Sequence, residues 1–212
     1  MKDWDLYLIT SQELSRGRTT LEVVQEAVVA GVQVVQLREK TFSSRELVEI
    51  GLAIRKITRQ HGVRFIVNDR VDVALAVKAD GVHLGQQDMP VKYARQIMGS
   101  HKIIGISATT LAEALEAQKA GADYLGVGPI FATQSKPDAA ALGLEGLKQI
   151  REAVNLPLVA VGGINRANAD TILEHGADCI SVISAITAAD NVYQATRELL
   201  NIISQAKGGG NS

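Results

Sequence analysis

The stretch FIVNDRVDVALAVKADGVHLGQQD, residues 65–88, decides the predicted fold because it joins two apolar strands through a short helix. The first strand, residues 65–67, ends in Asn68 and Asp69, and the second, residues 82–84, ends in a polar turn that closes on Asp88. If the two strands are parallel, their carboxyl ends meet at one edge of a sheet, where α/β folds place active sites. We therefore expect Asn68, Asp69 and Asp88 to lie close together at that edge.

Apolar strand-like runs and helix-like runs alternate along the whole chain. Most strand-like runs are nearly continuous Val, Ile and Leu, as is typical of parallel strands covered by helices. We expect strands at 6–10, 34–38, 64–68, 81–85, 103–107, 124–128, 158–162 and 179–184, and helices at 20–30, 43–60, 71–78, 91–98, 111–120, 144–153, 166–175 and 191–205. This alternation predicts an α/β protein, a single-domain (β/α)8 TIM barrel over residues 1–206 with a flexible tail over 207–212. A doubly wound open sheet is the alternative, because periodicity alone does not show closure.

A weak internal repeat supports this organisation. The segments VVAGVQVVQL, VKADGVHLG, QKAGADYLGVG and LEHGADCISVI share an order in which a helix ends, a Gly follows and an apolar strand begins. Gly is common where a helix ends in the left-handed conformation. These junctions are expected on the face opposite the chemistry, where they would serve stability.

Composition limits the classes of function. The 22 basic and 23 acidic residues nearly cancel, so the formal net charge of −1 gives no support for a nucleic-acid or membrane surface. The sequence MKDWDLYLIT at the start lacks the apolar length of a signal peptide, and we expect a cytoplasmic protein. Cys179, the one cysteine, lies in an apolar run and is expected to be a buried, inert thiol.

Polar side chains on one predicted strand form the first candidate binding surface. In the segment 35–40, Gln36, Arg38 and Lys40 alternate with Val35 and Leu37, so the polar set shares one face. Two cations and an amide that point into a barrel mouth would suit a diphosphate. The alternative is an edge strand with a solvated polar face.

The carboxylates of Asp69 and Asp88 form a candidate site for Mg²⁺. The alternative is that they cap helices or close turns, since Asp69 precedes the helix at Val71 and Asp88 precedes Pro90. His83 lies in the middle of a strand and is more simply read as a satisfied interior histidine than as a catalyst.

Three later segments offer groups for anions. The long connection after the sixth strand carries Thr133, Ser135 and Lys136, and long connections in small domains are usually functional. Gly162 and Gly163 follow the seventh strand, and residues 183–185 end the eighth. Barrel enzymes often bind a phosphate with the loops after these two strands. An ordinary polar loop and a tight turn without a ligand are the alternatives.

Taken together, the motifs resemble thiamine phosphate synthase. They are VQLREK, FIVNDR with VDVALA, GVHLGQQDMP, IIGIS, GVGPIFATQSKPDA, VGGI and SVISAI, in this order over about residues 5–190. The resemblance implies a barrel transferase of thiamine biosynthesis. It would join 4-amino-2-methyl-5-hydroxymethylpyrimidine diphosphate to 4-methyl-5-(2-phosphoethyl)thiazole or its carboxylated form, giving thiamine phosphate and diphosphate.

The resemblance also implies roles for particular residues. Arg38, Lys40, Lys136 and Ser107 would be catalytic, and Asp69 and Asp88 would bind Mg²⁺. The pyrimidine diphosphate would lie against Gln36, Leu37, Arg38, Glu39, Lys40, Asn68, Ser107 and Lys136. The thiazole phosphate would lie against Thr133, Gln134, Ser135, Gly163, Ile183 and Ser184. The chain departs from the family pattern at Ala132, where Pro is frequent, at Ser135, where Thr is frequent, and at Pro137.

The chemistry implied by the resemblance needs little from the protein beyond position and charge. The diphosphate leaves a pyrimidine-stabilised cation, which the thiazole nitrogen attacks, so no enzyme nucleophile is required. Small-molecule substrates are the expected partners, with a homo-oligomer left open. Two other functions remain as alternatives: a thiazole tautomerase of the same fold, and a non-catalytic barrel that senses a phosphorylated ligand.

Overall fold

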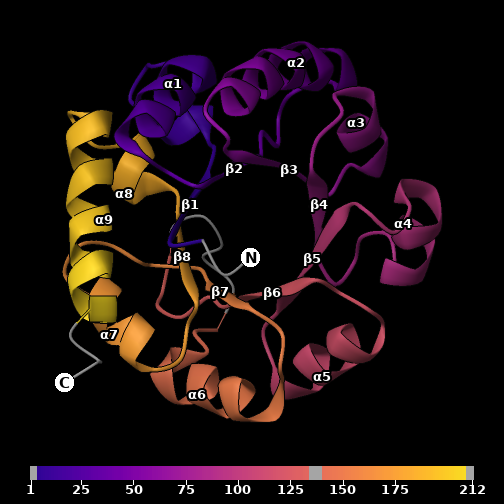
Figure 1. Cartoon of the computed structure of the whole chain (residues 1–212), viewed down its shortest axis with the longest axis vertical. Coiled ribbons are helices and arrows are strands. Elements are labelled where there is room, and N and C mark those ends of the chain that lie inside the picture. Colours follow the sequence, from indigo (N-terminus) through magenta and orange to yellow (C-terminus); the bar gives the residue numbers. More distant parts are fainter. Residues whose placement is uncertain (1–3, 134–139, 209–212) are drawn as a thin grey trace.

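Eight parallel strands close into a barrel in the computed structural model, which describes residues 4–133 and 140–208 (Figure 1). The strands are β1 (Leu6–Ile9), β2 (Val34–Leu37), β3 (Arg64–Asn68), β4 (Gly81–Leu84), β5 (Ile103–Ala108), β6 (Tyr124–Val127), β7 (Leu158–Ala160) and β8 (Cys179–Val182). Each strand pairs with its neighbour in sequence, and β8 returns to β1 with Leu8 opposite Val182. The predicted barrel is confirmed, and the open sheet is wrong.

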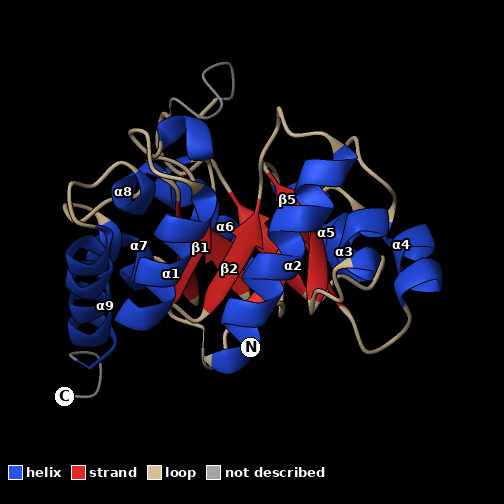
Figure 2. Cartoon of the chain, turned by 90° about the horizontal axis from the view of Figure 1, so that it is seen from above, coloured by secondary structure: helices blue, strands red, loops and turns tan. Residues whose placement is uncertain are grey.

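Helices surround the strands on all sides (Figures 1 and 2). They are α1 (Thr20–Ala30), α2 (Ser44–Gln60), α3 (Val71–Ala76), α4 (Val91–Met98), α5 (Leu111–Lys119), α6 (Gly143–Ala153), α7 (Ala169–Glu174), α8 (Ser184–Thr187) and α9 (Val192–Gly208), with a 3₁₀ turn, η1, at Gln12–Leu14. All eight predicted helices are present with ends shifted by a few residues. The sequence did not predict η1 and α8, because one turn is too short to show a helical period.

The last helix extends beyond its predicted end. Lys207 lies within α9, and its Nζ donates to Asp5 Oδ1 at 2.6 Å and to the Asp178 carbonyl at 2.7 Å. Lys207 and Gly208 therefore belong to α9, and the flexibility expected of the tail stays a prediction. Residues 209–212 lie outside the described part of the chain.

Apolar side chains fill two layers. The larger layer lies between the barrel and its helices, and the smaller one fills the barrel itself around Trp4, Tyr7 and Tyr124. The Trp4 ring meets both tyrosine rings edge-on, at centroid distances of 5.9 and 5.4 Å. Gly105 makes room for this packing, because a Cβ there would lie 2.0 Å from Tyr124 Cζ.

A repeated hydrogen bond ties the strands together in pairs at their amino-terminal ends. The residue before each even-numbered strand accepts a bond from a backbone N–H at the start of the strand before it. These strand clamps join Gln33 to Leu6 N at 2.9 Å, Asp80 to Phe65 N at 2.8 Å, Asp123 to Ile104 N at 2.7 Å and Asp178 to Leu158 N at 2.8 Å. The three aspartates also pair with arginines on the helix that precedes the odd-numbered strand of each pair: Arg55 on α2, Arg95 on α4 and Arg151 on α6.

The acceptors of the strand clamps fall within the four repeated segments of the sequence, which lie, as expected, on the face opposite the carboxyl ends of the strands; their role in stability stays a prediction. The left-handed residue is Gly31, Gly121 or Gly176 in three of them. In the second segment it is Lys78, at φ +54°, whereas Gly81 begins β4. The second segment thus keeps the predicted order of helix, Gly and strand, but its left-handed residue is Lys78 and not the Gly.

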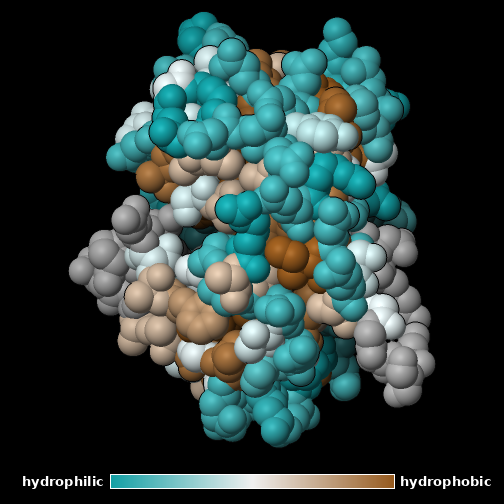
Figure 3. All heavy atoms as spheres, turned by 90° about the vertical axis from the view of Figure 1, so that its left-hand side faces the viewer, coloured by the Kyte–Doolittle hydropathy of each residue, from teal (hydrophilic) through white to brown (hydrophobic). Residues whose placement is uncertain are grey.

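The side of the molecule formed by α7, α8 and α9 presents mostly hydrophilic residues, with a few apolar ones among them (Figure 3). Within residues 4–133 and 140–208, no helix combines the length and apolar character needed to cross a membrane.

Candidate active site

A cavity of about 440 Å³ opens at the carboxyl ends of the strands. Predicted site residues line it on two sides. Gln36, Arg38, Asn68 and Ser107 come from β2, β3 and β5, whereas Thr133, Gly163, Ile183 and Ser184 follow β6, β7 and β8. Because the strands follow one another around the barrel, these two groups face each other across the cavity (Figure 1).

In residues 36–40, at the end of β2 and just after it, some side chains line the cavity and others pack into the scaffold. Gln36 and Arg38 line the cavity, and Lys40 is exposed beyond its lining. The Leu37 side chain is buried in the layer between barrel and helices. The buried carboxylate of Glu39 accepts hydrogen bonds from Gln12 N at 2.9 Å and Thr20 Oγ1 at 2.7 Å. The Leu37 and Glu39 side chains therefore contact the scaffold, and the expected contact of these two residues with the pyrimidine diphosphate stays a prediction.

The carboxyl groups of Asp69 and Asp88 meet, as the sequence predicted. Burial and the hydrogen bond with Asp88 raise the pKa of Asp69 to about 6, while Arg38 and Lys40 act in the opposite direction. Asp69 has a left-handed backbone at φ +60°, which is uncommon outside Gly and directs its N–H to the His83 carbonyl at 2.8 Å. Arg70, and not Asp69, stands at the start of α3, so the helix-capping alternative for Asp69 is wrong.

The turn-closing alternative for Asp88 is partly correct. Asp88 Oδ2 accepts a hydrogen bond from Gly85 N at 2.6 Å, so this carboxylate also shapes the turn after β4. Its position next to Asp69 leaves the pair with closely spaced negative charge, which a divalent cation would neutralise. No group of three or more potential metal ligands occurs among the described residues, so a cation held here would need further oxygens from water or substrate.

A chain of hydrogen bonds crosses the barrel beneath the cavity. Gln36 Nε2 donates to Tyr7 Oη at 2.7 Å, Tyr7 Oη meets Tyr124 Oη at 3.0 Å, and Tyr124 Oη meets His83 Nδ1 at 2.9 Å. His83 Nε2 then lies 3.0 Å from Ser107 Oγ. The chain thus links Gln36 to Ser107, the two predicted residues at its ends. Burial raises the pKa of both tyrosines, so they remain neutral.

His83 is an interior histidine with hydrogen bonds to both ring nitrogens, as the simpler reading predicted. The sequence analysis missed Tyr7 and Tyr124 as parts of the site. For Tyr124 the signal would have been a hydroxyl-bearing ring on a strand opposite Gly105 on the neighbouring strand, whereas Tyr7 lies opposite Val34 and Ser181 and gave no such signal. Cys179 is buried among these residues, and burial raises the pKa of its thiol, as expected of an inert cysteine.

The turn after β7 presents backbone to the cavity. Gly162 and Gly163 have φ of +98° and +67°, and a Cβ on Gly163 would lie 2.7 Å from Phe131 Cβ and 2.8 Å from the Ala132 carbonyl oxygen. Asn168 Nδ2 donates to the Gly163 carbonyl at 3.0 Å, which holds the turn from below. Only glycine fits this position, so its backbone can approach a ligand closely.

The connection after β6 is described only in part. Thr133 lines the cavity, whereas the predicted site residues Gln134, Ser135 and Lys136 lie outside the described residues.

Comparisons with known proteins agree on one family. A family model described as thiamine monophosphate synthase matches residues 6–186. A thiamine-phosphate synthase from Chloroflexus aurantiacus is 57% identical over 95% of this chain and 94% of that protein. A second, from Moorella thermoacetica, is 53% identical over 98% of this chain and 100% of that protein. The solved thiamine phosphate pyrophosphorylase from Pyrococcus furiosus is 48% identical, with a TM-score of 0.89, and covers 95% of this chain and 96% of that one.

Proposed function

This chain belongs to the thiamine monophosphate synthase family, and from that premise we propose which side of the cavity receives each substrate. The chain is a thiamine-phosphate synthase, and therefore a transferase that acts on small molecules. The matches do not favour a thiazole tautomerase or a ligand-sensing barrel.

The pyrimidine diphosphate takes the side of the cavity built by β2 to β5. Gln36 and Ser107 stand at the two ends of the interior hydrogen-bond chain, where they can orient a pyrimidine ring. Arg38 lines the same side, and Lys40 stands just beyond it. Guanidinium and ammonium groups suit a diphosphate because their charge offsets that of the leaving group.

The thiazole phosphate takes the opposite side. Gly163 exposes its backbone there, and Ile183 and Ser184 line the wall after β8. One observation carries the proposal: the cavity has a cationic side, where Arg38 follows β2, and an opposite side after β7 and β8, where Gly163 exposes its backbone. Thr133 belongs to the second side, and Gln134, Ser135 and Lys136 are proposed to complete the site from the same connection.

Asp69 and Asp88 are proposed to hold Mg²⁺, together with water and diphosphate oxygens. When bound, the cation would supply positive charge to the departing diphosphate. The bond between the methylene carbon of the pyrimidine substrate and the diphosphate oxygen breaks, and its electron pair leaves with the diphosphate. The lone pair of the thiazole nitrogen then forms the new C–N bond. The chain's own residues position the two substrates and stabilise charge.

Incubation with both substrates and Mg²⁺, followed by chromatography, tests the proposal. Thiamine phosphate and diphosphate should form in equal amounts, and omission of either substrate or addition of a chelator should abolish both. Product formation that is indifferent to the chelator would contradict the metal assignment. The carboxylated thiazole is tested in a parallel reaction. The cytoplasmic location is a prediction that cell fractionation tests, and gel filtration decides between a monomer and a homo-oligomer.

A further inference from the structure

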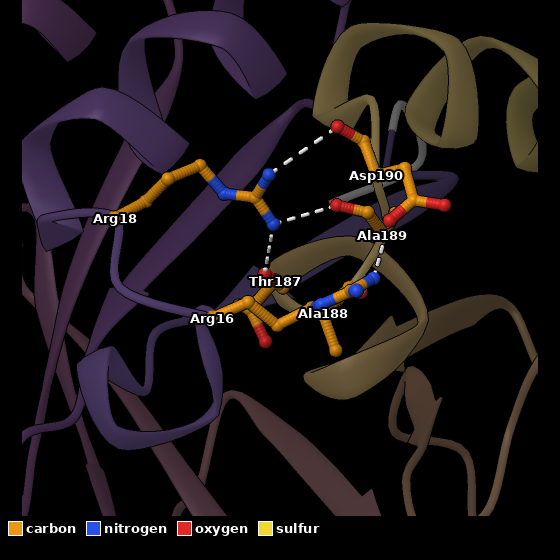
Figure 4. A network of polar contacts seen from close by, with 6 residues as sticks. All are labelled: Arg16, Arg18, Thr187, Ala188, Ala189 and Asp190. Carbon is orange, nitrogen blue, oxygen red and sulfur yellow. Dashed lines mark hydrogen bonds and ion pairs between the residues drawn. The ribbon is translucent and has the colours of Figure 1, made fainter.

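Arg18 binds the segment that follows β8 through its guanidinium group (Figure 4). Arg18 itself does not line the cavity. Its Nη2 donates to the Thr187 carbonyl at 2.9 Å and to the Ala189 carbonyl at 2.6 Å, and its Nη1 donates to the Asp190 carbonyl at 3.3 Å. One guanidinium therefore gathers three carbonyls at the end of α8. These are the groups that a helix end leaves without intrahelical partners.

The segment that carries Arg18 is itself fixed to the barrel. Arg16 and Gly17 adopt left-handed backbones, at φ +56° and +86°, and turn the chain sharply before Arg18. The Glu39 carboxylate anchors the start of this segment through Gln12 N and its end through Thr20 Oγ1. The segment that carries the Arg18 guanidinium is thus bonded on both sides to Glu39, which follows β2.

A single helical turn connects the carbonyls that Arg18 binds with the cavity wall. Within α8, Thr187 N donates to the Ile183 carbonyl at 2.9 Å and Ala188 N to the Ser184 carbonyl at 3.0 Å. Ile183 and Ser184 line the cavity, whereas Thr187 is 1% exposed. A shift of residues 187–189 would therefore move Ser184, because the turn between them is too short and too well bonded to absorb it.

We propose that Arg18 is a positioning residue for the phosphate group of the thiazole substrate. It acts through the carbonyls of Thr187, Ala189 and Asp190 and sets the place of Ser184 without touching the ligand. The proposal rests on the proposed function, which places the thiazole phosphate against Ser184. Without Arg18, the carbonyl of the buried residue Thr187 and that of the half-buried Ala189 would lose this donor, and the turn would relax toward other partners.

The neighbouring arginine supplies a matched control. Arg16 pairs with the Asp190 carboxylate, and the two side chains are 60% and 91% exposed. Such surface pairs contribute little to stability. Arg16→Ala removes the same charge from the same segment together with one exposed 3.4 Å hydrogen bond to the Ala188 carbonyl, and it leaves the carbonyls of Thr187 and Ala189 with Arg18.

The experiment is steady-state kinetics of the full chain with each substrate varied in turn. We expect Arg18→Ala to raise the KM for the thiazole phosphate about tenfold or more, with the KM for the pyrimidine diphosphate changed by less than about twofold. Arg18→Lys should fall between, since one ammonium cannot span the carbonyls as a guanidinium fork does. Arg16→Ala should behave as wild type. Ser184→Ala should raise the KM for the thiazole phosphate in the same selective way.

The outcomes separate the two levels of inference. A selective effect of Ser184→Ala with none of Arg18→Ala would overturn the role of Arg18 and leave the placement of the thiazole phosphate intact. No selective effect of Ser184→Ala would overturn that placement, and the role of Arg18 with it. Equal increases in both KM values, together with a lower melting temperature, would mean that Arg18 only stabilises the fold. Should Arg18→Ala not fold, Arg18→Lys decides by the same comparison.

Discussion

At the scale of single residues, Asp69 combines two unfavourable features. Its backbone is left-handed, and its carboxyl group faces that of Asp88 at partial burial. Strained backbones and closely spaced like charges persist where the surrounding structure imposes them, and both are more frequent at functional sites than elsewhere. The sequence predicted the meeting of the two carboxylates because they end adjacent parallel strands. The backbone strain has no counterpart in the residue pattern.

Asp69→Asn and Asp88→Asn test the metal assignment. Each is nearly isosteric, and Asn adopts a left-handed backbone readily, so neither should disturb the fold. Each removes one negative charge from the proposed cation site and should lower turnover at least about tenfold, or about 1.4 kcal/mol of barrier. Turnover measured against Mg²⁺ concentration should show a weaker dependence in both variants. Curves like those of wild type would retire the assignment.

The raised pKa of Asp69 predicts a pH dependence of stability in the metal-free protein. The folded state holds this proton more tightly than the unfolded state, so the stabilisation is complete below the unfolded pKa and is lost as pH rises through about 6. Asp69→Asn carries no such proton. In chelator, its free energy of unfolding should improve relative to wild type between about pH 4 and pH 7. Free energies of unfolding, measured with urea, that change in parallel with pH for the two proteins would contradict the raised pKa of Asp69.

At the scale of elements, the loops after β7 and β8 together form one wall of the cavity, and each is held from behind by a side chain. Asn168 holds the Gly163 carbonyl, and Arg18 holds the end of α8. The sequence identified the front of this wall from Gly163 and Ser184. It could not identify Arg18, because the first and last loops become neighbours only when the barrel closes.

Gly163→Ala tests the wall after β7. The new Cβ would press on Phe131 and Ala132 at the edge of the proposed thiazole side. The KM for the thiazole phosphate should rise about tenfold, well beyond any change for the pyrimidine diphosphate. Gly121→Ala is the matched control, since Gly121 has φ +87°, has open space around it and lies before β6 on the opposite face. A similar loss in both variants would point to backbone strain alone.

At the scale of the whole molecule, the strand clamps divide the barrel into four pairs of strands. Each pair has its own acceptor before the even-numbered strand, and three of the acceptors are aspartates that form an ion pair with an arginine. Hydrogen bonds to charged groups are stronger than those between neutral ones, so these contacts stabilise the barrel at the end opposite the active site.

Asp80→Ala tests a clamp. It leaves Phe65 N and Arg55 without their acceptor and should lower the free energy of unfolding by about 2–3 kcal/mol. Asp80→Asn keeps a neutral acceptor, as Gln33 does in the first clamp, and should lose less. Denaturant unfolding measures the change, and kcat and the two KM values should stay within about twofold of wild type. A variant that is stable but inactive would show that the clamp has a role at the active site.

The sequence predicted the architecture well because parallel strands covered by helices are almost uninterrupted apolar runs, as in Phe65 to Val67. It was less informative about whether a given side chain points into the cavity or into the scaffold around it. The family resemblance placed Glu39 beside Arg38 against the pyrimidine diphosphate, and only the fold shows that Gln12 and Thr20 bind its carboxylate. The contact between Tyr7 and Tyr124 joins residues 117 positions apart, a separation that no local pattern reports.

Three of the four strand pairs, those that begin with β3, β5 and β7, come directly after a helix in the sequence. No such helix precedes the first pair in the described residues, and it is the last helix that covers it. α9 packs against α1 and β1, and its Lys207 pairs with Asp5 beside β1. During synthesis on the ribosome, β1 and β2 therefore emerge first and wait longest for their cover. Until residues 192–203 leave the exit tunnel, the face of α1 that α9 will bury stays open to water. Within the barrel, this face of α1 is therefore made early and covered late, because α9 is the last helix of the fold.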